Sequence, residues 1–121
     1  MPTRASIRDK ESLDDVSPAA ASVTMVISCF TIANDMALEV QAAFRSRPHL
    51  VDHAHGFLGM EVMSPLNNSA EIWLLTRWRD EQSYQTWHRG HEYRESHMGL
   101  PKGLKLVPGK TQIRVFSVFA N

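Results

Sequence analysis

Residues 70–90, AEIWLLTRWRDEQSYQTWHRG, hold a strand that passes directly into a helix, and the rest of the fold can be built outward from them. The run AEIWLLTRW has the apolar, partly β-branched composition of a strand. Asp80 is a good N-cap because its carboxylate can accept a hydrogen bond from a free N–H group of the first helical turn. We therefore expect a helix from Glu81 to Gly90, which resumes through Met98 after a weak join at the glycine.

Upstream, residues 22–32, SVTMVISCFTI, are expected to form a strand covered on both faces. Asn34 or Asp35 should cap a helix through Arg47, which Pro48 ends. One apolar stripe of that helix would pack on the sheet, and it comprises Met36, Val40, Ala43 and Phe44.

A polar link over 49–56 leads to a second strand, GFLGMEVMSP, and residues 65–69 have the composition of a hairpin turn. Residues 99–109, rich in glycine and proline, should form a loop. The alternating run TQIRVFSVFA at 111–120 is expected to be the last strand.

The order βαββαβ predicts an α+β, ferredoxin-like fold with a four-stranded antiparallel sheet and both helices on one face. The opposite face would be apolar as well, with Trp73, Leu75, Phe116 and Val118 on it. Because one domain seldom exposes that much apolar surface, a second copy could cover it and give a homodimer. The alternative is that these residues form the helix-covered side, since alternation does not say which face is which.

Composition bounds the class of protein. The 121 residues suffice for one domain, expected over 22–121. Thirteen basic and thirteen acidic side chains balance, so the net charge gives no reason to expect nucleic acid or an anionic membrane as partner. Near-neutrality is compatible with self-association.

Cys29 is the single cysteine, which excludes an internal disulfide and favours a reducing compartment. Residues 1–21 lack the apolar stretch of a secretory signal and are expected to be a disordered N-terminal leader. No later segment is long and apolar enough to span a membrane, so we expect a soluble, cytoplasmic protein.

The element order, the GFLGMEV and AEIWLLTRW strands and the SYQTW helix together resemble the antibiotic-biosynthesis-monooxygenase (ABM) superfamily of dimeric α/β-barrel proteins, over residues 23–120. The run WHRGHEYRESH is most similar to the IsdG-type haem-degrading monooxygenases. Their site joins an Asn on the first strand, a Trp on the second helix and a haem-ligating His near that helix's end. Trp87 and His97 match the last two, and Ser28 stands where those enzymes carry Asn.

The resemblance implies a role for each residue. His97 would ligate the haem iron, Trp87 would press on the macrocycle and distort it, and Ser28 would hydrogen-bond the reacting oxygen or a water. Arg94, Lys102 and Lys105 would bind the propionates. Haem would serve as substrate and cofactor, dioxygen as oxidant, and an external reductase as electron donor.

The spacing of Trp87 and His97 has a geometric consequence. On an unbroken helix they would lie roughly 15 Å apart and about 80° out of phase, too far to share a small site. A break at Gly90 would let both side chains line one cavity. Gly90→Ala should therefore weaken ligand binding by more than the ~1 kcal/mol difference in helix propensity.

Other interpretations remain open from the sequence. The chain could be a cofactor-independent monooxygenase of a phenolic or quinone-like substrate, in which His97 relays a proton, or a non-catalytic dimeric binding domain. Trp87 could be only a core residue, and His97 a solvated residue at a helix end. A zinc site is conceivable among the histidines and carboxylates around the polar link, which are His49, Asp52, His53, His55 and Glu61, whereas His88 and His91 lack a third ligand.

Overall fold

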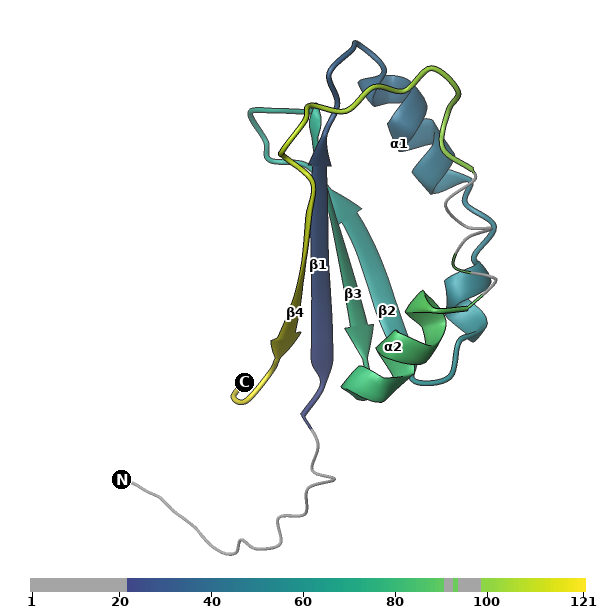
Figure 1. Cartoon of the computed structure of the whole chain (residues 1–121), viewed down its shortest axis with the longest axis vertical. Helices are drawn as coiled ribbons and strands as arrows, with labels where there is room; N and C mark the ends of the chain where they lie inside the picture. Colours follow the sequence, from purple (N-terminus) through teal and green to yellow (C-terminus); the bar gives the residue numbers. More distant parts are fainter. Residues whose placement is uncertain (1–21, 91–92, 94–98) are drawn as a thin grey trace, which may run out of the picture.

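The structure is a computed structural model that describes residues 22–90, 93 and 99–121 (Figure 1). In chain order its elements are β1 (Thr24–Thr31), α1 (Ala37–Arg45), the short 3₁₀ helix η1 (Leu50–His53), β2 (Phe57–Met63), β3 (Glu71–Trp78), α2 (Glu81–His88) and β4 (Gln112–Ser117). None of the described helices is long and apolar enough to cross a membrane. The proposed leader, residues 1–21, lies outside the described residues.

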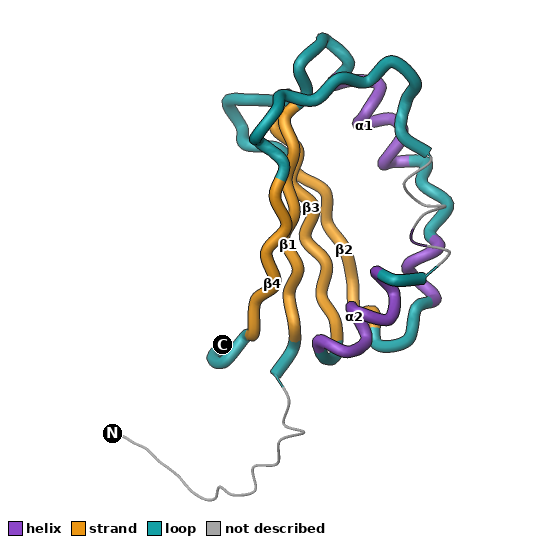
Figure 2. Tube along the Cα trace, in the orientation of Figure 1, coloured by secondary structure: helices purple, strands orange, loops and turns teal. Residues whose placement is uncertain are grey.

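The four strands form one antiparallel sheet in the order β2-β3-β1-β4. Both helices lie on one face of this sheet, and β4 is the edge strand farthest from them (Figures 1 and 2). This arrangement confirms the predicted α+β, ferredoxin-like βαββαβ fold.

The alternation along the strands assigns the two faces. Leu74 and Trp78 of β3 pack toward the helices, in two separate core clusters. Trp73 and Leu75 therefore point to the opposite, helix-free face, as predicted. Phe116 of β4 pairs with Met25 and lies on that same face, whereas Val118 follows the end of β4.

Two apolar clusters hold the helices to the sheet. Near α1 the buried residues are Ile32, Val40 and Ile72, and Val40 is fully buried, as the predicted helical stripe requires. Near α2 and η1 they are Val26, Val51, Trp78 and Tyr84. The clusters lie toward opposite ends of the sheet, which leaves room between them for a cavity.

The start of α1 differs from the prediction. The helix begins at Ala37 after Met36 and has no side-chain cap. The amide of Asn34 instead donates to the carbonyl oxygen of Gly103, 2.9 Å away, and Ala33 N donates to the carbonyl of Lys105. The expected cap is thus used to fasten the loop after α2, and α1 ends at Arg45 rather than at Arg47.

The link between α1 and β2 is more ordered than its polar composition predicted. It contains η1, whose Val51 is buried in the cluster near α2. His49 precedes η1 with a left-handed backbone, φ 59°. This turn brings the end of α1 back toward the sheet.

Candidate active site

An apolar cavity of about 470 Å³ lies between the helices and the sheet. Its walls come from all four strands on one side and from α1, η1 and α2 on the other. Such a volume is within the usual range for small-molecule and cofactor sites. Most of the lining side chains are apolar, among them Val26, Phe30, Phe44, Leu74, Trp78 and Ile113.

Trp87 lines this inner cavity from α2. Asp80 fixes the start of the helix by accepting a hydrogen bond from Ser83 N at 2.8 Å, as predicted, and this bond lowers the pKa of Asp80. Trp87 packs against the buried cluster of Trp78 and Tyr84, and its ring meets that of Tyr93 edge to face at 6.3 Å.

Helix α2 ends at His88, just before Gly90, whose N–H donates to the carbonyl of Trp87 at 2.9 Å. Tyr93 is again helical. The helix is thus interrupted where the glycine predicted a weak join. Of the expected second helical segment, residues 91–98, only Tyr93 is among the described residues.

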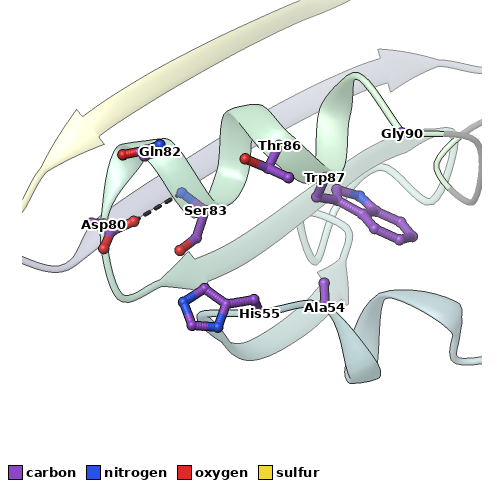
Figure 3. Close-up of a pocket in the computed structure, with 8 residues that line it drawn as sticks. All are labelled: Ala54, His55, Asp80, Gln82, Ser83, Thr86, Trp87 and Gly90. Atoms are coloured by element: carbon purple, nitrogen blue, oxygen red, sulfur yellow. Dashed lines mark hydrogen bonds between the residues drawn. The ribbon is translucent and has the colours of Figure 1, made fainter.

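Trp87 also borders a second, open groove of about 500 Å³ on the outer side of α2. Figure 3 shows this groove, with Asp80, Ser83 and Thr86 above and Ala54 and His55 of the link below. The indole therefore lies between the apolar inner cavity and the outer groove. A core tryptophan would have been enclosed on all sides, so this position favours contact with a ligand.

Ser28 faces the inner cavity from the central strand β1, opposite Leu74 and Ile113 in the register. Cys29 follows it on the helix-free side, where its thiol lies 3.9 Å from the carbonyl oxygen of Lys110. The structure thus brings Ser28 and Trp87 to one cavity.

The remaining predicted site residues are not among the described residues that line the cavity. His97 and Arg94 lie outside the described residues. Lys102 and Lys105 are exposed in the loop after α2 and do not line the inner cavity. Their proposed contact with propionates remains a prediction.

Two basic side chains that the sequence analysis did not assign to this cavity line it on the α1 side. Arg47 and His49 both contact Asp52, at 3.0 and 3.2 Å. Burial alone would raise the pKa of Asp52. The hydrogen bonds with Arg47 and His49 outweigh that effect, so the pKa lies below its usual value of 3.8. The sequence shows basic side chains in residues 45–49, but it does not show which of them point into the cavity.

Two phenols also line the cavity, Tyr84 and Tyr93. Burial, together with the nearby Tyr93, raises the pKa of Tyr84 above its ordinary value of 10.0, and burial alone raises that of Tyr93. Both are therefore neutral hydrogen-bond donors at neutral pH.

The zinc site considered for residues 49–61 is not formed. Within the described part of the chain, no three histidine, cysteine or carboxylate side chains gather as metal ligands. His49 pairs with Asp52, and Glu61 pairs with Arg77 at 2.7 Å on the helix-free face.

Comparison with known proteins gives relatives with oxygenase chemistry. A haem oxygenase (mycobilin-producing) of Mycobacterium tuberculosis is 29% identical over 52 residues, which are 43% of this chain and 50% of that protein. The match thus spans half the length of that relative.

Solved structures share the fold at low sequence identity. SnoaB, a cofactor-independent oxygenase from Streptomyces nogalater, superposes with a TM-score of 0.67 at 12% identity, over 84% of this chain and 97% of SnoaB. The haem degrader MhuD of M. tuberculosis, solved with two haems in its active site, gives 0.65 at 20% identity, over 81% of this chain and 97% of MhuD.

The family model described as "Antibiotic biosynthesis monooxygenase" matches residues 24–98, which run from the start of β1 past the end of α2 and contain Ser28 and Trp87. This chain therefore belongs to the antibiotic biosynthesis monooxygenase family.

Proposed function

We propose that this protein is a haem-degrading monooxygenase, which binds haem through His97 and opens the porphyrin with dioxygen to release iron. The observation that carries the proposal is the inner cavity, where Ser28 and Trp87 face one apolar space between helices and sheet. The partial match to a mycobacterial haem oxygenase supports it.

The cavity suits a flat aromatic ligand with carboxylates. Its apolar walls would accept a macrocycle, and its volume is of the size that cofactors occupy. On the α1 side the guanidinium of Arg47, beside its ion pair with Asp52, and the imidazole of His49 offer hydrogen-bond donors to which carboxylates could bind. They join Arg94, Lys102 and Lys105 as candidate partners of the propionates.

The chain's residues have distinct tasks in this proposal. Haem would supply the iron at which dioxygen reacts, with electrons from an external reductase. His97 would hold the iron, and Trp87 would press against the macrocycle from α2. Ser28 would donate a hydrogen bond from β1, and the apolar walls would keep bulk water out.

Titration with hemin tests this function. We expect a stoichiometric complex with a Soret band, lost in His97→Ala and kept in His53→Ala, which alters an exposed histidine away from the cavity. Under ascorbate and oxygen the Soret band should then decay. The absence of a complex would rule the proposal out, and a stable band would indicate a haem carrier.

A second candidate is a cofactor-independent monooxygenase of a phenolic or quinone-like substrate. It is favoured by the serine at position 28, which has one hydroxyl donor in place of a carboxamide, and by the shared fold with SnoaB. Trp87 and Ser28 would position the substrate and His97 would relay a proton. Oxygen uptake with a hydroxyanthraquinone in the absence of haem would distinguish it.

We also propose that the protein acts as a homodimer, in which a second copy covers the helix-free face. Apolar side chains populate that face on all strands, including Met25, Ile27, Met63, Trp73 and Phe116. Phe116 and Met63 remain 37% and 45% exposed in the single chain. Paired sheets would remove them from water.

A further inference from the structure

We infer that the Tyr84 hydroxyl is a specificity-determining hydrogen-bond donor, which selects a planar ligand of the inner cavity that carries a carboxylate or carbonyl oxygen. The inference rests on the proposed function only in taking this cavity as the ligand site. It starts from a buried phenol for which the fold itself gives no partner.

The ring of Tyr84 is held on two sides. It packs edge to face on Trp78 at 5.9 Å and lies 5.5 Å from the ring of His88 one turn along α2. The residue is only 8% exposed. These contacts fix the ring before any ligand arrives, so little rotamer entropy would be lost when the hydroxyl forms a bond.

The hydroxyl has no protein partner among the described residues. The indole N–H of Trp78, whose ring packs on Tyr84, donates to Thr76 Oγ1 at 2.9 Å and not to the phenol. Among the described side chains, Asn34 Oδ1 is the polar atom that is fully buried without a hydrogen-bond partner, and Tyr84 is not in that position. The Tyr84 hydroxyl oxygen thus has no hydrogen bond to a described residue, and it is not completely enclosed by protein atoms.

The space that Tyr84 borders is the inner cavity. Buried tyrosine hydroxyls usually find a hydrogen-bond partner, and the cavity is where a ligand could supply one. Because burial keeps the phenol protonated, it can donate but cannot act as an anion at neutral pH. The matching ligand group is an acceptor oxygen.

Two ligand classes carry such an oxygen. In haem it would belong to a propionate carboxylate, and in a quinone-like substrate to a ring carbonyl. A Phe at position 84 would keep the packing on Trp78 and His88 and remove only the donor. Tyr84→Phe is therefore the direct test, and it should fold as the wild type does.

The experiment compares wild type and Tyr84→Phe in binding titrations with three probes: hemin, iron(III) etioporphyrin, which has alkyl groups in place of propionates, and 1,8-dihydroxyanthraquinone. Tryptophan fluorescence and the Soret band report binding, and thermal unfolding of the free proteins reports stability. The neighbouring variant Gln85→Ala, whose side chain contacts Glu81 outside the cavity, controls for a general disturbance of α2.

We expect Tyr84→Phe to bind hemin roughly tenfold more weakly, as for loss of a hydrogen bond to a charged group. Etioporphyrin binding should change by less than about twofold, Gln85→Ala should bind all probes as wild type does, and the melting temperature of free Tyr84→Phe should not fall, since no protein hydrogen bond is lost.

The other outcomes separate this inference from the proposed function. If wild type ignores hemin but binds the anthraquinone in a Tyr84-dependent way, the inference stands and haem degradation falls. Equal binding of hemin by wild type and Tyr84→Phe, or equal losses of affinity for hemin and etioporphyrin, overturns the role of Tyr84 while leaving the haem function intact. If no probe binds wild type, both are overturned.

Discussion

At the scale of single residues, Gly56 has almost no room for a side chain. Its φ is +80°, and a Cβ there would lie 2.5 Å from the Cβ of Ser83 on α2. Its carbonyl also accepts a 2.7 Å hydrogen bond from Arg79 N. We expect Gly56→Ala to lower the free energy of unfolding by about 3 kcal/mol, from backbone strain and collision together.

Gly109→Ala is the matched control, because its φ is +78° and nothing lies within 4 Å of the added methyl. It should cost only about 1 kcal/mol of strain. Urea denaturation of the two variants measures both values. Equal losses would show that the link and α2 do not touch as described.

Ser28 is the residue at which the chain departs from the haem-degrading pattern. It is half-buried and faces the cavity, so Ser28→Asn would add a longer side chain with two donors to that space. If haem is degraded here, we expect the variant to consume hemin several-fold faster under ascorbate and oxygen. Thr31→Asn, on the opposite face of β1, should leave the rate unchanged, and an unchanged or lower rate in Ser28→Asn would mean that another residue occupies the distal side.

Sequence reasoning could place Ser28 and Trp87 together because the resemblance to the IsdG-type enzymes marked both positions, and both do line the inner cavity. It could not assign Tyr84, Arg47 or His49 to the cavity, because their positions depend on contacts between distant segments. The place of Tyr84 follows from the packing of α2 on β3, where its ring meets that of Trp78. The direction of His49 follows from a left-handed backbone that no pattern indicated.

At the scale of elements, the end of α2 at His88 decides how the chain leaves the cavity. A Cβ on Gly90 would lie 3.2 Å from the carbonyl oxygen of Trp87, so an alanine requires a shift of the segment that follows Trp87. We expect Gly90→Ala to change the free energy of unfolding by no more than ~1 kcal/mol but to weaken hemin binding more than about fivefold.

Thermal unfolding and hemin titration measure these two effects, with Arg89→Ala, an exposed residue in the same turn, as control. Normal hemin binding by Gly90→Ala would show that the interruption of the helix does not shape the site.

Capping shows why some element boundaries were predictable and others were not. Asp80 caps α2 as expected because its acceptor, Ser83 N, is local in sequence. Asn34 had an equally good local option at α1, yet its amide bonds to Gly103 across 69 residues. A tertiary hydrogen bond overrode the local preference, and α1 starts later as a result.

At the scale of the whole molecule, the sheet is apolar on both faces, but the helices cover only one. The prediction of Trp73, Leu75 and Phe116 on the uncovered face was correct because β1, β3 and β4 alternate in register. The second copy that we propose for that face lies outside the single chain, so the pattern of one chain does not define it. The oligomeric state in solution therefore decides whether a second copy covers this face.

Phe116 gives the sharpest test of the dimer. It lies on the uncovered face with the Arg114 guanidinium 5.2 Å from its ring centre, so Phe116→Lys would place a second cation beside Arg114 where a partner sheet must pack. We expect sedimentation velocity to show a wild-type dimer and a dissociation constant raised at least about 30-fold in Phe116→Lys. Phe119→Lys, which alters a 94% exposed residue beyond the end of β4, should remain dimeric. A monomeric wild type, or a Phe116→Lys variant that dimerises as tightly as wild type, would mean that the helix-free face is not the interface.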